Sequence, residues 1–70
     1  MNSDALQLVE SKNYKELKKH LLGWSPTEIV EFLSQLDERD LGIVFRLLPT
    51  HLAAEVFAEL ETNQQKLLLE

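Results

Sequence analysis

The sequence of 70 residues contains no cysteine, only two glycines and two prolines, and few aromatic residues. The lack of cysteine excludes a disulfide framework and a thiolate metal site. No apolar run approaches the roughly 18 residues that a membrane-spanning helix needs. The N-terminal segment lacks a basic start followed by an apolar run, so no secretory signal is expected. Since no linker of glycine, serine or proline divides it, we expect a single domain over residues 1–70.

Motifs for catalysis are also absent. The sequence has no nucleophile motif, no glycine-rich phosphate loop and no His-Glu-x-x-His pattern. The two histidines, His20 and His51, are far apart and lack the spacing of metal ligands. We therefore predict that the chain is not an enzyme.

The net charge of −5 is unevenly distributed. Residues 1–24 hold four lysines against three acids, a sum of +1, whereas residues 25–70 hold nine acids against three bases, a sum of −6. An acidic body argues against nucleic acid as the main partner. It suits a cation or a basic protein surface, although acidic surfaces are also common on domains with no such partner.

A repeat of twelve residues runs from Ser25 to Leu60. Its blocks cover residues 25–36, 37–48 and 49–60, and each has apolar residues at its fifth, eighth, ninth and twelfth positions. This spacing of i, i+3, i+4 and i+7 is typical of one stripe of an α-helix. Each block is therefore predicted to form one short helix plus its turn, and residues 13–24 fit the same period.

Short helices joined by tight turns must fold back sharply and bury their stripes against each other. We expect an all-α fold, a superhelical stack of about six short helices with a ~12-residue repeat. Such stacks usually bind a partner rather than catalyse a reaction. The predicted core contains two columns of the repeat, Phe32, Val44 and Val56 at the eighth position and Leu33, Phe45 and Phe57 at the ninth. Phe45→Ala is expected to cost about 3–5 kcal/mol.

Clear start signals open the repeats. Ser25 is a predicted N-cap, with Pro26 at the first helical position and Glu28 completing a capping box. Asp37 repeats the cap one block later. Pro49 starts the following helix and also prevents the previous one from continuing, because the residue before a proline is pushed out of the α region.

Weaker signals mark the second helix and the last helix. Asn13 is predicted to cap the second helix with Glu16 as its capping-box partner. Gly23 is predicted to end that helix in the left-handed conformation. Thr62 or Asn63 is expected to cap the last helix.

The last repeat is incomplete. Leu67, Leu68 and Leu69 face the end of a stack, where a polar cap is expected. Either these leucines fold back, or the natural protein continues, or two chains pair there. We expect continuation, so that the domain is truncated at its C-terminal end.

Glu55 and Glu59 are four residues apart, so both carboxylates project from one face of a helix. They repel each other unless a cation lies beside them, and their oxygens suit Mg²⁺ and Ca²⁺. Pairs with this spacing also occur on ordinary helices, so spacing alone leaves ion binding open.

Two segments resemble the N-terminal cytoplasmic domain of MgtE magnesium transporters. The resemblance rests on the helix start Ser25-Pro26 and on Leu47-Leu48-Pro49 followed by Ala53-Ala54-Glu55-Val56. The second of these is the more specific, and the similarity extends from about residue 3 to residue 70. A flagellar motor switch protein, FliG, contains a related superhelix.

The resemblance implies a right-handed superhelix that precedes a pair of CBS domains and the membrane-embedded dimeric pore. It implies a location at the cytoplasmic face of the cell membrane. In that family, Mg²⁺ between the N-terminal domain and the CBS domains holds the cytosolic part compact and the pore closed. By position, Glu55 inherits the role of a Mg²⁺ ligand. Glu59 is a weaker candidate that rests on its helical spacing from Glu55 alone. Further acidic ligands lie beyond the end of this chain, so Mg²⁺ binding by residues 1–70 alone should be weak.

A different function remains open at this point. A protein-interaction scaffold of the flagellar-switch or adaptor type would need no ion and would bind through the apolar surface at Leu67–Leu69.

The role of the four lysines between Lys12 and Lys19 is also open. They could contact anionic lipid or simply form a solvated helix face.

Overall fold

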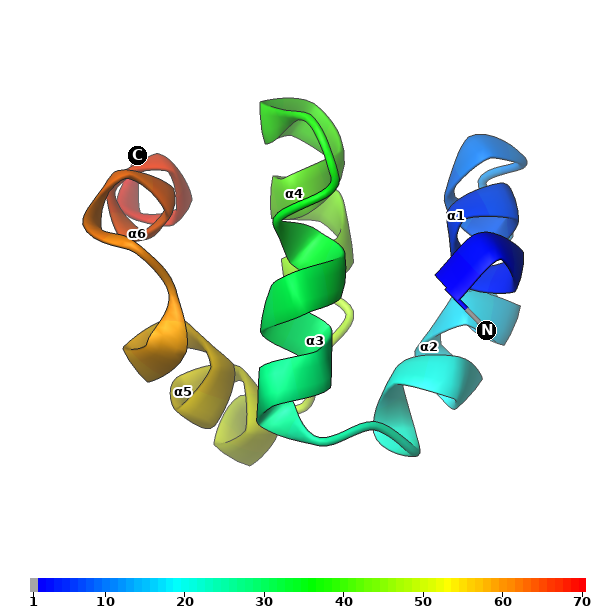
Figure 1. Ribbon diagram of the computed structural model, residues 1–70, viewed down its shortest axis with the longest axis horizontal. Helices are drawn as coiled ribbons and strands as arrows, with labels where there is room; N and C mark the ends of the chain where they lie inside the picture. Colours follow the sequence, from blue (N-terminus) through cyan, green and yellow to red (C-terminus); the bar gives the residue numbers. More distant parts are fainter. Residues whose placement is uncertain (1) are drawn as a thin grey trace.

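The computed structural model describes residues 2–70, which form six α-helices and contain no strand. The helices are α1 (Asn2–Glu10), α2 (Tyr14–Leu22), α3 (Pro26–Leu33), α4 (Glu38–Phe45), α5 (Thr50–Glu59) and α6 (Thr62–Leu69). In Figure 1 they lie in three neighbouring pairs, with α1 and α2 on the right, α3 and α4 in the centre, and α5 and α6 on the left. The predicted all-α class is confirmed, and this succession of pairs is compatible with a superhelical stack. Within residues 2–70 no helix is both long and apolar enough to span a bilayer.

The twelve-residue repeat determines where the helices begin. The residues that precede α2 to α6 are Asn13, Ser25, Asp37, Pro49 and Glu61, each twelve positions after the last. The repeat read from residues 25–60 therefore extends in both directions along the chain. One short helix per repeat is confirmed.

Helices α3 and α4 begin at strong side-chain caps. The Ser25 hydroxyl accepts a hydrogen bond from the Glu28 amide at 3.2 Å, and the Ser25 amide donates to the Glu28 carboxylate at 2.8 Å. The Asp37 carboxylate accepts from the Asp40 amide at 2.8 Å. Each bond satisfies an amide that the first helical turn leaves without a partner. The predicted capping box at Ser25 and N-cap at Asp37 are confirmed.

Asn13 has the predicted position before α2, but the predicted capping hydrogen bonds are wrong. Asn13 precedes α2, but within the described chain its side chain makes no capping bond. The reason is the way α1 ends. Lys12 adopts a left-handed conformation with φ of 59°, its amide donates to the carbonyl of Val9 at 3.1 Å, and the Asn13 amide donates to the carbonyl of Leu8 at 2.9 Å. This pair of bonds is a Schellman motif, and it fixes Asn13 at φ −88° and ψ 69°, outside the extended region of a normal N-cap.

Two further predictions about helix ends need correction. Gly23 has φ of −92° and ψ of 0°, so it ends α2 in a right-handed turn rather than a left-handed one. Its amide donates to the His20 carbonyl at 3.0 Å, a tight last turn that needs no glycine. Helix α6 begins after Glu61, whose amide donates to the Gln64 side chain at 3.0 Å. The predicted caps Thr62 and Asn63 both lie inside α6.

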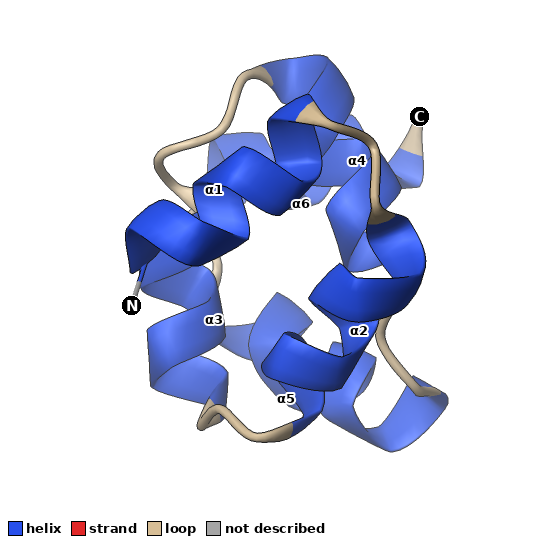
Figure 2. Cartoon of the chain, turned by 90° about the vertical axis from the view of Figure 1, so that its right-hand side faces the viewer, coloured by secondary structure: helices blue, strands red, loops and turns tan. Residues whose placement is uncertain are grey.

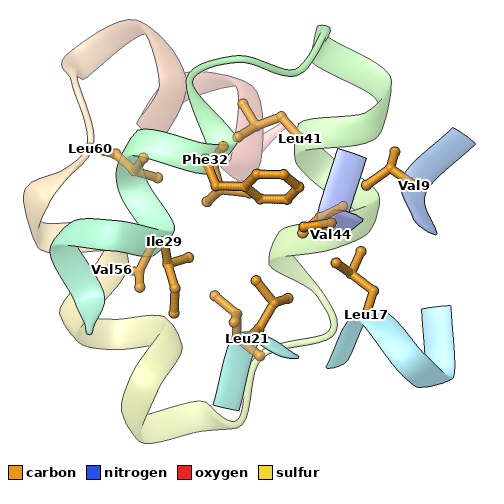
Figure 3. Close-up of a cluster of buried hydrophobic side chains, with 12 residues drawn as sticks. Val9, Leu17, Leu21, Ile29, Phe32, Leu41, Val44, Val56 and Leu60 are labelled. Carbon is orange, nitrogen blue, oxygen red and sulfur yellow. The ribbon is translucent and has the colours of Figure 1, made fainter. Parts of the chain in front are cut away.

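One continuous apolar cluster joins the helices (Figure 3). Its fully buried eighth-position column, Phe32, Val44 and Val56, is confirmed. In the ninth-position column Leu33 is fully buried, but Phe45 and Phe57 are half-buried and pack with ring centroids 6.3 Å apart. Adjacent positions on a helix point about 100° apart, so both columns cannot point straight into one core. Phe45 therefore packs at the edge of the predicted core rather than fully inside it.

The three C-terminal leucines do not share one environment. Leu67 and Leu68 are partly buried against the apolar cluster, whereas Leu69 is 78% exposed. Their helix, α6, packs against α4. Apolar surface at Leu69 is therefore in contact with solvent in this structure.

Candidate functional site

Helix α5 carries both of the predicted metal ligands. It begins directly after Pro49, and Glu55 and Glu59 are exposed on it, one turn apart. Residues separated by four positions lie on the same helical face, so the structure brings the two carboxylates to one side of α5, as predicted. Glu59 is the last residue of the helix, next to the turn that leads into α6.

Glu59 is tied to another helix by a contact that the sequence did not reveal. The Thr27 hydroxyl donates a hydrogen bond to the Glu59 carboxylate at 3.0 Å. Thr27 lies in the first turn of α3, the helix against which α5 packs most extensively. The two residues are 32 positions apart, and no local motif signals a pairing at that separation. The site therefore includes Thr27, which no sequence pattern had singled out.

A second polar contact fastens the other end of α3 to the C-terminal pair of helices. The Gln64 amide group donates to the Ser34 hydroxyl at 3.2 Å, and that hydroxyl donates to the Val30 carbonyl at 2.9 Å. The Gln65 side chain also donates to the Phe57 carbonyl at 2.7 Å. Polar contacts at both ends of α3 thus hold the α5–α6 pair in a defined orientation beside it.

The negative charge near α5 has no close basic partner. Within the part of the chain that the structure describes, the one ion pair joins Lys19 to Glu16 at 3.2 Å, on α2. None of the nine acids of residues 25–70 therefore has a described lysine, arginine or histidine within ion-pair distance. Glu55 also has no hydrogen-bond partner among the described side chains. Its carboxylate is available to an external cation.

Glu55 and Glu59 fit one side of a Mg²⁺ site rather than a complete cage. Across residues 2–70 no three His, Cys, Asp or Glu side chains are grouped closely enough to hold a metal ion. Mg²⁺ commonly keeps several waters and binds through one or two carboxylates, so an exposed pair of this kind meets part of its requirement. The remaining ligands would have to come from water or from another surface.

Two surface hollows of the described chain lie away from the α5 carboxylates. One is lined by residues of α1 and α2, including Asp4 and His20, and another lies between the start of α2 and the start of α4. Figure 2, viewed from the side of α1 and α2, shows these two helices in front of the rest of the chain. Glu55 and Glu59 line neither of these hollows and are exposed to solvent.

Comparison with known proteins assigns the chain to a family. A family model described as the MgtE intracellular N domain matches residues 24–70, which include α3 to α6 and all three residues of the candidate site. No curated protein and no solved structure matches the chain. Because the match covers more than half of the sequence, the chain belongs to the MgtE intracellular N domain family.

Proposed function

We propose that this chain is the regulatory, Mg²⁺-sensing domain of a magnesium transporter. The observation that carries the proposal is the family match over residues 24–70, together with Glu55 in the motif that suggested the family. Glu55 is exposed and has no partner among the described side chains. In this role the domain carries no catalytic residue, and its function is to bind an ion and a partner surface.

The physical basis is bridging by a divalent cation. Two acidic surfaces repel each other, and a divalent ion between them removes the repulsion and supplies shared coordination. Mg²⁺ then stabilises the closed arrangement because it binds that arrangement more tightly than the open one. Glu55 is the proposed main ligand and Glu59 the second, with the other ligands supplied by the partner.

The proposed partners follow from the same role. They are the CBS domains and the membrane-embedded pore of a parent transporter that works as a homodimer, and the domain would lie at the cytoplasmic face of the membrane. With only one side of the site in this chain, Mg²⁺ binding to residues 1–70 alone should be weak.

A titration of the isolated chain with Mg²⁺, followed by amide NMR at constant ionic strength, tests the ion site. We expect shifts centred on α5 that saturate only at millimolar or higher Mg²⁺. Glu55→Gln keeps the size of the side chain but removes its charge, and it should weaken this response several-fold. Glu10→Gln is the matched control, because it removes one charge on α1, at the other side of the molecule (Figure 1). An equal loss in both variants would indicate general screening and contradict the site.

The partner is tested on the full-length transporter. Its cytosolic part should become compact as Mg²⁺ is added, as measured by small-angle scattering or protease protection. Glu55→Ala should shift this transition to higher Mg²⁺. A transition that is unchanged in Glu55→Ala would show that Glu55 is not a ligand.

One observation favours a second function. Leu69 is 78% exposed at the end of α6, where an ion-independent scaffold would bind a protein partner. That function predicts no response of α5 to millimolar Mg²⁺ and a partner interaction that Leu69→Ser removes. The same titration separates the two functions.

A further inference from the structure

We infer that Thr27 is a positioning residue for the Mg²⁺ surface, which it serves by holding the Glu59 carboxylate in place. This inference rests on the proposed function and adds a residue to it. The observation behind it is the 3.0 Å hydrogen bond from the Thr27 hydroxyl to Glu59, which joins α3 to α5.

Thr27 is itself held firmly. It follows Pro26 in the first turn of α3, inside the capping box that Ser25 and Glu28 form. Proline fixes the backbone entering the helix, and a β-branched side chain has few rotamers. The Thr27 hydroxyl oxygen is therefore restricted to few positions, and the bond restricts the Glu59 carboxylate in turn.

The hydrogen bond leaves Glu59 able to bind a cation. A carboxylate offers about four lone-pair sites, and the threonine hydroxyl occupies one of them. Carboxylates that bind metals in proteins are commonly hydrogen-bonded in this way, since the bond orients the ligand. The contact at Glu59 is thus of the kind that prepares a ligand rather than one that blocks it.

The two glutamates differ for this reason. Glu55 has no side-chain partner among the described residues, so an ion that binds it must also order a flexible chain. Glu59 is already ordered by Thr27 before any ion arrives. Glu59 therefore contributes more to affinity than its weak sequence signal indicated, and this contribution depends on the Thr27 hydroxyl.

The test is Mg²⁺ affinity of the full 70-residue chain in three variants. Thr27→Val keeps the shape and removes the hydroxyl. It should weaken Mg²⁺ binding about fivefold, less than the roughly 10- to 100-fold that loss of such a supporting bond typically costs, because the site is exposed. Thr27→Ser restores a hydroxyl and should recover most of the affinity. Thr50→Val is the matched control, since Thr50 is an exposed threonine in the first turn of α5. Melting temperatures measured without Mg²⁺ show whether each variant is folded.

The outcomes separate this inference from the function on which it rests. Weak binding in Thr27→Val, rescue by serine and no effect of Thr50→Val would support it. If the wild-type α5 responds to Mg²⁺ and Thr27→Val binds equally well, the positioning role is wrong and the proposed function stands. Equal weakening in Thr27→Val and Thr50→Val also overturns the positioning role. If the wild-type α5 does not respond to Mg²⁺, both proposals are contradicted.

Discussion

Residues 1–23 and residues 24–70 achieve their packing by different means. The first segment is slightly basic and holds the Lys19–Glu16 ion pair, whereas the second is strongly acidic and has no ion pair within its described residues. Within the described chain, α2 in the first segment begins without a side-chain cap. In the second segment α3 and α4 begin with one, whereas α5, which follows Pro49, does not. The family match covers only the second segment.

The contrast extends to how helices are joined. Among the described residues, the side-chain hydrogen bonds between helices, Thr27–Glu59, Gln64–Ser34 and Gln65–Phe57, all lie in the second segment. Helices α1 and α2 contribute apolar residues to the shared core, including the fully buried Leu17 and Leu21. Apolar burial is non-directional, whereas hydrogen bonds and caps fix orientation. The second segment is therefore the part of the molecule in which hydrogen bonds fix the orientation of the helices.

The largest expected effect comes from the core of the second segment. Phe32 is fully buried and meets Trp24 edge-to-face, with centroids 5.4 Å apart and an interplanar angle of 82°. Phe32→Ala should lower the free energy of unfolding by about 3–5 kcal/mol, a large share of the stability of a domain this small. Urea unfolding followed by circular dichroism measures it, and Phe32→Leu provides a milder variant if the alanine protein does not fold.

Phe45→Ala is the matched comparison for Phe32→Ala. Phe45 has the same side chain but is only half-buried, so its loss should cost at least about 1 kcal/mol less. This expectation replaces the larger effect that the sequence pattern predicted for Phe45. Equal losses at the two positions would show that the eighth and ninth columns of the repeat contribute alike.

Most of the fold could be predicted from the twelve-residue repeat. Apolar residues at four fixed positions predicted one helix per twelve residues, and the helix starts obey that spacing from Asn13 to Glu61. The period itself would have placed the last cap at Glu61, but capping preference favoured the neighbouring Thr62 and Asn63. A glutamate can begin a helix here because the Gln64 side chain accepts the bond of its amide.

What the sequence could not predict depends on contacts between distant or weakly constrained residues. The Thr27–Glu59 bond spans 32 positions and follows from how α3 and α5 pack, which a helical period does not encode. The left-handed end of α1 could not be predicted either, because residues in that conformation are usually glycine and here the residue is Lys12. Glu55 was identified through a family motif. Its availability to an ion followed only from its exposure and from the lack of a partner among the residues that the structure describes.

An intermediate effect tests the difference in capping. Ser25→Ala removes the bond to the Glu28 amide and should lower the free energy of unfolding by about 1 kcal/mol. Asn13→Ala should change the free energy of unfolding by only a few tenths of the Ser25→Ala effect, because Asn13 makes no capping bond in the described chain. Thermal and urea unfolding of both variants measure the difference. Equal effects would mean that the two segments do not differ in how their helices begin.

The smallest effect concerns the left-handed residue in the first segment. A side chain in that conformation costs roughly 1–2 kcal/mol, and glycine avoids this cost but adds freedom to the unfolded chain. Lys12→Gly should therefore raise the free energy of unfolding by about 0.5–1 kcal/mol, measured as a higher urea midpoint.

Gly23→Ala is the matched variant at the end of α2. Gly23 has a right-handed backbone, and a Cβ there would meet the His20 carbonyl oxygen at an ordinary 3.6 Å. We expect this variant to be as stable as the wild type or slightly more so, because alanine restricts the unfolded chain. If Lys12→Gly were more stable than the wild type and Gly23→Ala less stable, residues 12 and 23 would both have a left-handed backbone. That result would remove the contrast between the Schellman end of α1 and the tight right-handed end of α2.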